Sequence, residues 1–226
     1  MKKVAFLGSA TALKPKIVLE TLLNNSNKLD YDIVCLTNED SGYFVDYCRS
    51  LMLEIIIFDD NIVETLKNNN IKLDLLVSIG WPHKIKVDVL EYFDFKAINC
   101  HGSYLPDYRG SRAYMHYWAN CEEYFGATIH YINEKFDDGN ILIQQKLKLL
   151  ESDTPHTLHY RGSELCGILL PAAIEMVFRN CSGFKGDGLK RYFKSLSHQE
   201  FEKYRKHNEG KIPSERIMTP HKIIEN

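Results

Sequence analysis

The sequence predicts an α/β protein with a Rossmann-like, mainly parallel central sheet, and three observations lead to that fold class. Short, nearly continuous apolar runs recur through the first half of the chain, which is typical of strands buried on both faces. Segments with helical spacing of apolar residues alternate with these runs, as in successive βαβ units. With 226 residues, 44% of them apolar, the chain can bury a core without disulfide or metal cross-links.

The elements of the first half follow one another in a regular order. Residues 3–8 form an apolar run that ends in Gly8, which indicates a strand that stops at a turn. The spacing of apolar residues from Ile17 to Leu23 predicts a helix face. The same alternation predicts further strands over 31–37, 54–58 and 73–80, with helices over 42–51 and 61–69 between them.

The pattern changes after residue 95. We predict strands over 95–101, 126–132 and 140–145, a helix over 113–121, and the longest helix over 158–178. The remaining residues are polar and interrupted by glycines, and no linker marks a clean domain boundary. We take residues 1–180 as the main domain and 181–226 as a short C-terminal extension.

Charge and cysteine content narrow the classes of function. Lys and Arg total 28 and Asp and Glu total 30, so the charge balance gives no reason to expect bulk nucleic-acid binding. The six cysteines contain no C-x-x-C pair, which favours reduced thiols in a cytoplasmic protein. A membrane span would need about 20 consecutive apolar residues, and the chain has no such run. Lys14 and Lys16 interrupt the apolar N-terminal stretch too early for a signal peptide.

Three short patterns give only weak functional signals. The turn over 8–14 lacks the G-x-G-x-x-G pattern of a dinucleotide site, so it is interpreted as an ordinary strand-to-helix turn. His156 and His159 could share a helix face, but beyond Asp153 no third metal ligand is evident. Ser103 lacks the G-x-S-x-G context of a nucleophilic serine. We therefore expect neither a metal site nor serine hydrolysis.

The strongest cluster is Asn99 and His101, at the end of an apolar strand. Residues two positions apart in a strand point to the same side, and open α/β sheets place ligands at the carboxyl ends of their strands. Asp137, in the loop before the last strand, could supply a carboxylate to the imidazole. An amide donor, an imidazole and a carboxylate suit acyl transfer, because they can hold an oxyanion and move protons. Spacing alone leaves a purely structural role open.

The segment from Asn99 to Gly110 resembles the motif N-x-H-x-S-x-L-P-x-x-R-G of the formyltransferases that use N10-formyltetrahydrofolate. Residues 126–130 and 136–141 are similar to the strand and the D-x-G element of that family, and the likeness spans residues 1 to about 180. The resemblance implies a formyltransferase catalytic domain with Asn99, His101 and Asp137 as its catalytic residues. It implies no metal, and it favours Asp137 over Asp138 because one residue separates Asp137 from the glycine.

The resemblance is strongest to the sugar N-formyltransferases. The chain has few residues after its longest helix, and the turn over 8–14 is not glycine-rich, which weakens the methionyl-tRNA and glycinamide ribonucleotide alternatives. We therefore expect formyl transfer to the amine of a nucleotide-linked amino sugar, such as a dTDP-4-amino-4,6-dideoxyhexose for bacterial surface polysaccharide. By family likeness the protein would be a homodimer. A non-catalytic nucleotide-binding protein on the same fold is the rival from another class.

Residues 78–85 resemble the family's loop between the folate and sugar sites. The residues expected to contact the folate donor are Ser78, Gly80, Trp81, Pro82 and Ile85. Gly80 would allow close approach of the backbone, and Trp81 offers an aromatic surface. For the diphosphate of the sugar nucleotide, the candidates are Lys84 and Arg109, since such a dianion needs a fixed cation or several N–H donors.

Overall fold

The computed structural model describes residues 1–26, 28–59 and 61–224, and a seven-stranded sheet lies at its centre. The strand order is β3-β2-β1-β4-β5-β7-β8, with β1 to β5 parallel and β7 and β8 antiparallel to their neighbours. This arrangement confirms the predicted mainly parallel sheet. The strands are β1 (Lys2–Leu7), β2 (Tyr31–Thr37), β3 (Glu54–Ile57), β4 (Leu75–Ile79), β5 (Ala97–His101), β7 (Tyr124–Tyr131) and β8 (Ile141–Lys148).

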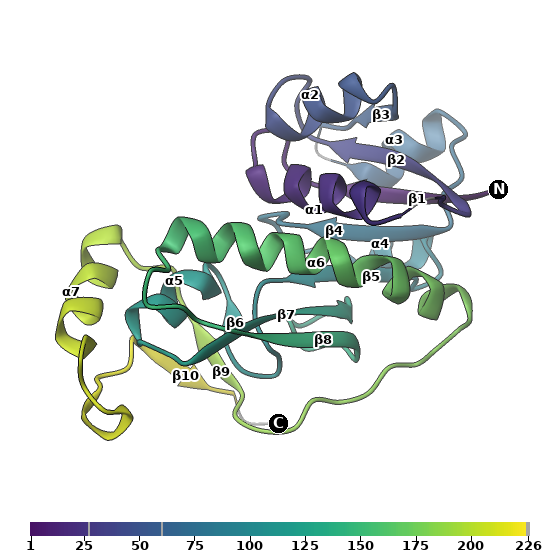
Figure 1. The fold of residues 1–226 in the computed structure, drawn as a ribbon. Helices are drawn as coiled ribbons and strands as arrows, with labels where there is room; N and C mark the ends of the chain where they lie inside the picture. Colours follow the sequence, from purple (N-terminus) through teal and green to yellow (C-terminus); the bar gives the residue numbers. More distant parts are fainter. Residues whose placement is uncertain (27, 60, 225–226) are drawn as a thin grey trace.

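Helices cover both faces of this sheet (Figure 1). On one face lie α1 (Leu13–Asn24), α2 (Tyr43–Ser50) and α6 (Pro155–Phe178), and on the other α3 (Ile62–Asn68) and α4 (Val87–Tyr92). The side chains of β1 alternate between the two cores, with Val4 and Phe6 packed in the first and Ala5 and Leu7 in the second. Burial on both faces explains why the strands are continuous apolar runs rather than alternating ones.

The longest helix begins three residues earlier than the sequence pattern predicts. Thr154 caps its first turn, accepting from the Thr157 N–H at 3.2 Å, while the Thr157 hydroxyl accepts from the Thr154 N–H at 2.9 Å. Pro155 occupies the first helical position, where a missing N–H is harmless. These polar residues carry no apolar period, so periodicity placed the start at Leu158 instead.

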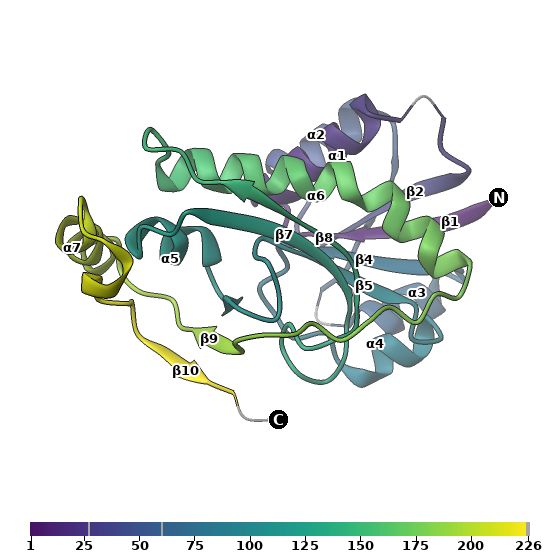
Figure 2. The same ribbon diagram turned by 60° about the horizontal axis from the view of Figure 1, so that its bottom comes forward.

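The C-terminal segment after α6 is folded, although its sequence suggested only a polar extension. It contains β9 (Arg191–Phe193), α7 (His198–Asn208), a 3-10 turn (Pro213–Glu215) and β10 (His221–Ile223). The chain crosses the molecule after α6, and β9 then pairs with the two-residue strand β6 (Arg109–Gly110) in the order β10-β9-β6 (Figure 2). Helix α7 packs on α5 (Ala113–Ala119). The division at residue 180 stays a prediction, and residues 225–226 lie outside the described part.

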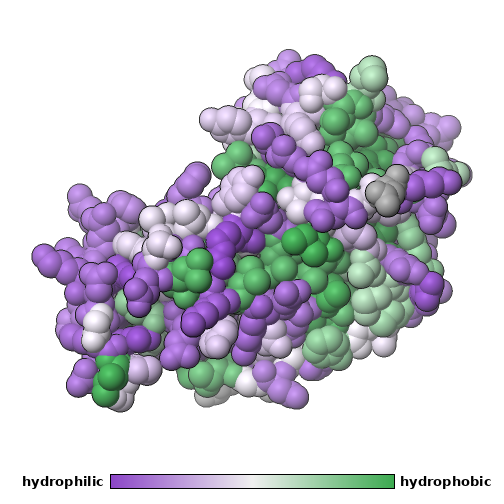
Figure 3. Space-filling view, viewed as in Figure 1, coloured by the Kyte–Doolittle hydropathy of each residue, from purple (hydrophilic) through white to green (hydrophobic). Residues whose placement is uncertain are grey.

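The surface on the α1 and α6 side is mixed in character. Figure 3 shows hydrophobic residues exposed along the middle of this view, where α6 runs, and mainly hydrophilic residues over the C-terminal segment. Ile168 of α6 is 52% exposed. Within the described residues, no helix is long and apolar enough to cross a membrane.

Candidate active site

A cavity of about 450 Å³ opens at the carboxyl ends of the central strands. It lies next to β1 and β4, where the strand order reverses and where open α/β sheets place their ligands. The catalytic residues expected from sequence, Asn99, His101 and Asp137, all line it. Asn99 and His101 come from β5, whose backbone the sheet fixes, and Asp137 comes from the loop that joins β7 to β8.

The Asp137 carboxylate is the centre of this cluster. Its Oδ1 lies 3.3 Å from His101 Nδ1 and 3.4 Å from Asn99 Nδ2, and its Oδ2 accepts from the Gly110 N–H at 2.9 Å. The other ring nitrogen of His101, Nε2, lies 3.1 Å from the carbonyl oxygen of Tyr108. Both oxygens that face the imidazole can only accept, so His101 donates to both of them only when it is protonated.

His130 is a fourth member of the cluster, which sequence reasoning did not assign to the site. Its Nδ1 lies 2.8 Å from the Tyr131 carbonyl, and its Nε2 lies 3.6 Å from Asp137 Oδ1. In the neutral ring the hydrogen on Nδ1 faces the carbonyl and Nε2 accepts, whereas the protonated ring directs an N–H toward Asp137. Asn99 Nδ2 donates to this Nε2 at 3.2 Å. The available signal was a polar residue at a buried position of an otherwise apolar strand, opposite Asn99 in the register of β5 and β7.

Burial and charge set the protonation of this cluster. Burial lowers the pKa of His101, and the Asp137 charge offsets part of that effect. For Asp137, burial alone would raise the pKa, but His101, His130 and the Gly110 N–H together hold it well below its usual range. At neutral pH the site therefore contains an ionised carboxylate beside an imidazole that is neutral but adjacent to an anion able to stabilise its cation.

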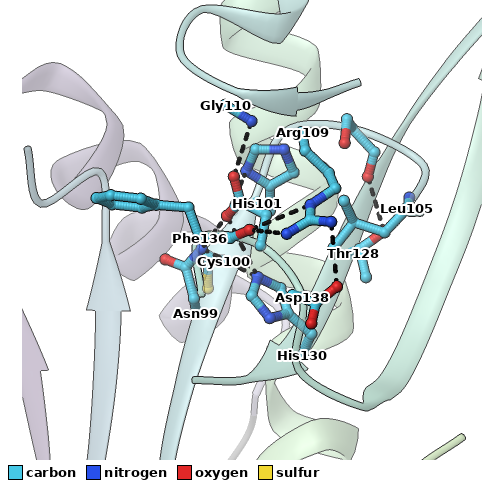
Figure 4. Close-up of polar contacts among 12 residues, drawn as sticks. Asn99, Cys100, His101, Leu105, Arg109, Gly110, Thr128, His130, Phe136 and Asp138 are labelled. Atoms are coloured by element: carbon cyan, nitrogen blue, oxygen red, sulfur yellow. Dashed lines mark hydrogen bonds and ion pairs between the residues drawn. The ribbon is translucent and has the colours of Figure 1, made fainter. Parts of the chain in front are cut away.

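Arg109 does not line the cavity, contrary to the position expected of a diphosphate ligand. Its side chain is buried, and its Nε donates to the Phe136 carbonyl at 3.1 Å, with Nη2 contacting the same oxygen. Its Nη1 pairs with Asp138 Oδ1 at 3.1 Å. Arg109 thus holds the residues on either side of Asp137 (Figure 4). The cation that reaches the cavity from this segment is Arg112, just before α5.

The loop after β4 forms the opposite wall. The residues expected to bind the donor, Ser78, Gly80, Trp81, Pro82 and Ile85, all line the cavity, and so does Lys84. Gly80 has φ +63°, a conformation that favours glycine. The Trp81 ring packs against Phe58 with ring centroids 5.5 Å apart, and this contact holds the loop against the fold.

The structure also places the three weaker candidates from the sequence, which are Ser103, the pair His156 and His159, and the turn over 8–14. The Ser103 hydroxyl is buried and donates to the Asp107 carbonyl at 3.2 Å. His159 lines the cavity while His156 is exposed, and among the described residues no group of three or more His, Cys, Asp or Glu side chains could hold a metal ion. From the turn over 8–14, Lys14 reaches the cavity and its Nζ donates to the Cys100 carbonyl at 2.5 Å.

Comparison with known families agrees with this geometry. Residues 55–174 match the model of a family described as formyl transferase, which is more than half of the 226 residues. The chain belongs to the formyl transferase family. The resemblance predicted from the motif over 99–110 is therefore confirmed at the level of the family.

Named relatives show how far the likeness extends. The methionyl-tRNA formyltransferase of Methylacidiphilum infernorum is 36% identical over 107 residues, which are 47% of this chain and 33% of that protein. This chain spans between 33% and 47% of the length of the first such relatives.

Solved structures extend the likeness at the level of the fold. A glycinamide ribonucleotide transformylase from Symbiobacterium toebii has a TM-score of 0.68 at 20% identity, covering 80% of this chain and 89% of that one. An N-formyltransferase from Helicobacter canadensis, in complex with folinic acid and dTDP-3-aminofucose, has a TM-score of 0.67 at 21% identity, covering 92% of this chain and 80% of that one.

Proposed function

We propose that this protein transfers a formyl group from N10-formyltetrahydrofolate to the amine of a nucleotide-linked amino sugar. The observation that carries the proposal is the convergence of Asn99, His101 and Asp137 in one cavity, with donor distances of 3.3 and 3.4 Å to a single carboxylate oxygen. A protein that only binds nucleotides would not need this set. The folate donor is supported by the family membership and by the loop over 78–85, which lines the same cavity.

The reaction begins with attack of a neutral amine on the formyl carbon. A C–N bond forms, the carbonyl oxygen becomes an oxyanion, and an N–H of Asn99 Nδ2 donates a hydrogen bond to it. We assign this hydrogen bond to the Asn99 N–H that faces Asp137 at 3.4 Å, since the other N–H faces His130 at 3.2 Å. His130, fixed by Tyr131, therefore keeps the Asn99 amide oriented while one donor becomes available.

The proton of the attacking amine passes to the pair formed by Asp137 and His101. Protonated His101 donates both to Asp137 and to the Tyr108 carbonyl, and its charge lies beside the oxyanion. Collapse of the tetrahedral intermediate breaks the bond between the formyl carbon and N10 of the folate. The pair gives its proton to N10 as this bond breaks, so that tetrahydrofolate and the N-formylated amine leave and the enzyme regains its starting state.

The acceptor side of the cavity carries cations suited to a diphosphate. Lys84 and Arg112 both line the cavity, and both are exposed. The Helicobacter canadensis enzyme supports a sugar-nucleotide acceptor, because its likeness covers 92% of this chain and so extends into the C-terminal segment. The likeness to the Symbiobacterium toebii transformylase covers less of this chain, 80%. We also propose a homodimer and a cytoplasmic location, as the sequence suggested.

The test measures formyl release from N10-formyltetrahydrofolate with four acceptors side by side. These are a dTDP-amino sugar, a UDP-amino sugar, glycinamide ribonucleotide and methionyl-tRNA. We expect kcat/KM to be highest for an amino sugar nucleotide. Asp137→Asn should remove this activity, while Asp138→Asn, its neighbour with the same change of charge, should keep a measurable part of it. Preference for glycinamide ribonucleotide or methionyl-tRNA would refute the acceptor class.

A further inference from the structure

The C-terminal strand β9 contacts the loop that follows β5 through an ion pair between Arg191 and Asp107. Arg191 Nε lies 2.9 Å from Asp107 Oδ1 and 3.2 Å from Oδ2, and Nη2 also contacts Oδ2. Both side chains are mostly buried, at 13% and 22% exposed. A bidentate guanidinium–carboxylate pair shielded from water fixes geometry as well as adding stability.

Aromatic stacking continues this contact into the next residue. The Tyr108 ring lies between Tyr117, at 3.8 Å, and Phe193 of β9, at 4.4 Å, nearly parallel to both. The Arg191 guanidinium lies over the same ring at 5.1 Å from its centroid. Tyr108 has φ +54°, so the surrounding contacts hold it in a conformation that non-glycine residues rarely adopt.

The pairing of β6 with β9 fixes the end of this loop. Gly110 pairs with Phe193, and a Cβ at Gly110 would lie 2.4 Å from the Phe193 carbonyl oxygen. With φ +98°, this position suits glycine alone. The loop from Asp107 to Gly110 is therefore held from one side by the C-terminal segment.

The other side of the same loop holds the catalytic groups. The Tyr108 carbonyl faces His101 Nε2 at 3.1 Å, and the Gly110 N–H donates to Asp137 at 2.9 Å. We propose that Arg191 is a positioning residue for formyl transfer, acting through Asp107 and Tyr108 to hold the Tyr108 carbonyl against His101. The inference rests on the proposed function, because it assigns Arg191 a role in that reaction.

The groups that face His101 predict how its pKa changes when the Arg191 contact is lost. Asp137 and the Tyr108 carbonyl favour the protonated ring, whereas His130 and Lys14 disfavour it, as does burial. Without the contact between Arg191 and Asp107, the Tyr108 carbonyl would move away from His101 while the other groups stay in place. The pKa of His101 would then fall further, and the cation that forms during turnover would lose one of its two acceptors.

The experiment compares Arg191→Met and Arg191→Lys with the parent. For Arg191→Met we expect kcat to fall about tenfold to a hundredfold, as for displacement of a catalytic group by about 1 Å. KM for donor and acceptor should stay within about twofold, because the residue touches neither, and the acidic limb of the kcat profile should move to lower pH. Arg191→Lys, which keeps the charge, should recover part of kcat.

Arg216→Met is the matched control. Arg216 is another arginine of the C-terminal segment that bonds backbone carbonyls, those of Lys211 and Cys121, away from the cavity. This variant should lower Tm while kcat and its pH profile stay unchanged. An Arg191→Met enzyme with the same behaviour, losing Tm but keeping kcat and the profile, would overturn the inference.

A readout without substrate separates this inference from the proposed function. The His101 imidazole can be titrated by NMR in the unliganded protein, with His101→Asn used to assign its signals. We expect a lower His101 pKa in Arg191→Met than in the parent or in Arg216→Met. If no acceptor is formylated but this shift appears, the proposed function fails and the positioning contact stands. An unshifted His101 in Arg191→Met refutes the positioning role.

Discussion

Replacing Arg109 by Met tests whether this residue binds substrate or holds the catalytic loop. The sequence suggested a diphosphate contact, which would make the acceptor KM rise. The structure instead places the guanidinium on the Phe136 carbonyl and on Asp138, at 3.1 Å in each case. These contacts flank Asp137, so their loss should affect the position of the carboxylate to which we assign a catalytic role and leave the proposed acceptor contacts intact.

The size of the effect follows from those contacts. A hydrogen bond to a charged group contributes about 1.5–3 kcal/mol, and Arg109 is buried while Asp138 is 29% exposed. Taking the lower value for each contact, the free energy of unfolding should fall by about 3 kcal/mol, which for a chain of this size lowers Tm by about 6–12 °C. A displacement of Asp137 by about 1 Å should lower kcat about a hundredfold.

Calorimetry and steady-state kinetics check both parts of this prediction. Arg112→Met serves as the control, because Arg112 is exposed at the cavity and should change Tm little while raising the acceptor KM. A higher acceptor KM for Arg109→Met, with kcat and Tm unchanged, would show that the guanidinium binds substrate after all and would refute the loop assignment.

Three further predictions address other groups. His101→Asn should lower kcat by at least about a hundredfold with little change in either KM, measured by steady-state kinetics; turnover within a few-fold of the parent would contradict the mechanism. Lys84→Ala should raise the acceptor KM and leave the donor KM nearly unchanged, and an unchanged acceptor KM would remove Lys84 from the site. Burial lowers the pKa of His116 to about 4, so between that pH and about 6.5 the unfolded chain binds the extra proton and stability falls as pH falls. Urea unfolding should show a loss of about 3 kcal/mol from this group across that window, and His116→Asn should flatten the slope, whereas an equal slope in the variant would assign the effect elsewhere.

Much of the fold, and the meeting of Asn99, His101 and Asp137 in one cavity, could be predicted from sequence for identifiable reasons. The strands were visible because burial on both faces makes them apolar throughout. Asn99 and His101 were visible because two polar residues at the end of such a strand share one face. His130 carried the same signal on the neighbouring strand, and the antiparallel register that brings it opposite Asn99 is what the sequence alone did not provide.

Some contacts of Arg109 and His101 could not be predicted in the same way, because the partners in those contacts are backbone carbonyls. Arg109 bonds the carbonyl of Phe136, 27 positions away, and His101 faces the carbonyl of Tyr108. Every residue has a carbonyl, so the identity of the partner leaves no trace in composition or spacing. The exposed and the buried arginine, Arg112 and Arg109, lie three positions apart in the same polar segment, and only the path of the loop decides which one reaches the cavity.

The path of that loop also explains why the C-terminal segment matters to the site. The main sheet fixes Asn99 and His101, but Asp137 and the residues from Asp107 to Gly110 lie in loops beyond the strand ends. Loops of this kind need outside contacts to hold a catalytic geometry, since the sheet does not constrain them. Strand β9 supplies those contacts through Arg191 and Phe193. A segment with little apolar periodicity can therefore hold the loop beside the candidate site without contributing to the main core, because it contacts that loop through one ion pair, one aromatic stack and a short strand pairing.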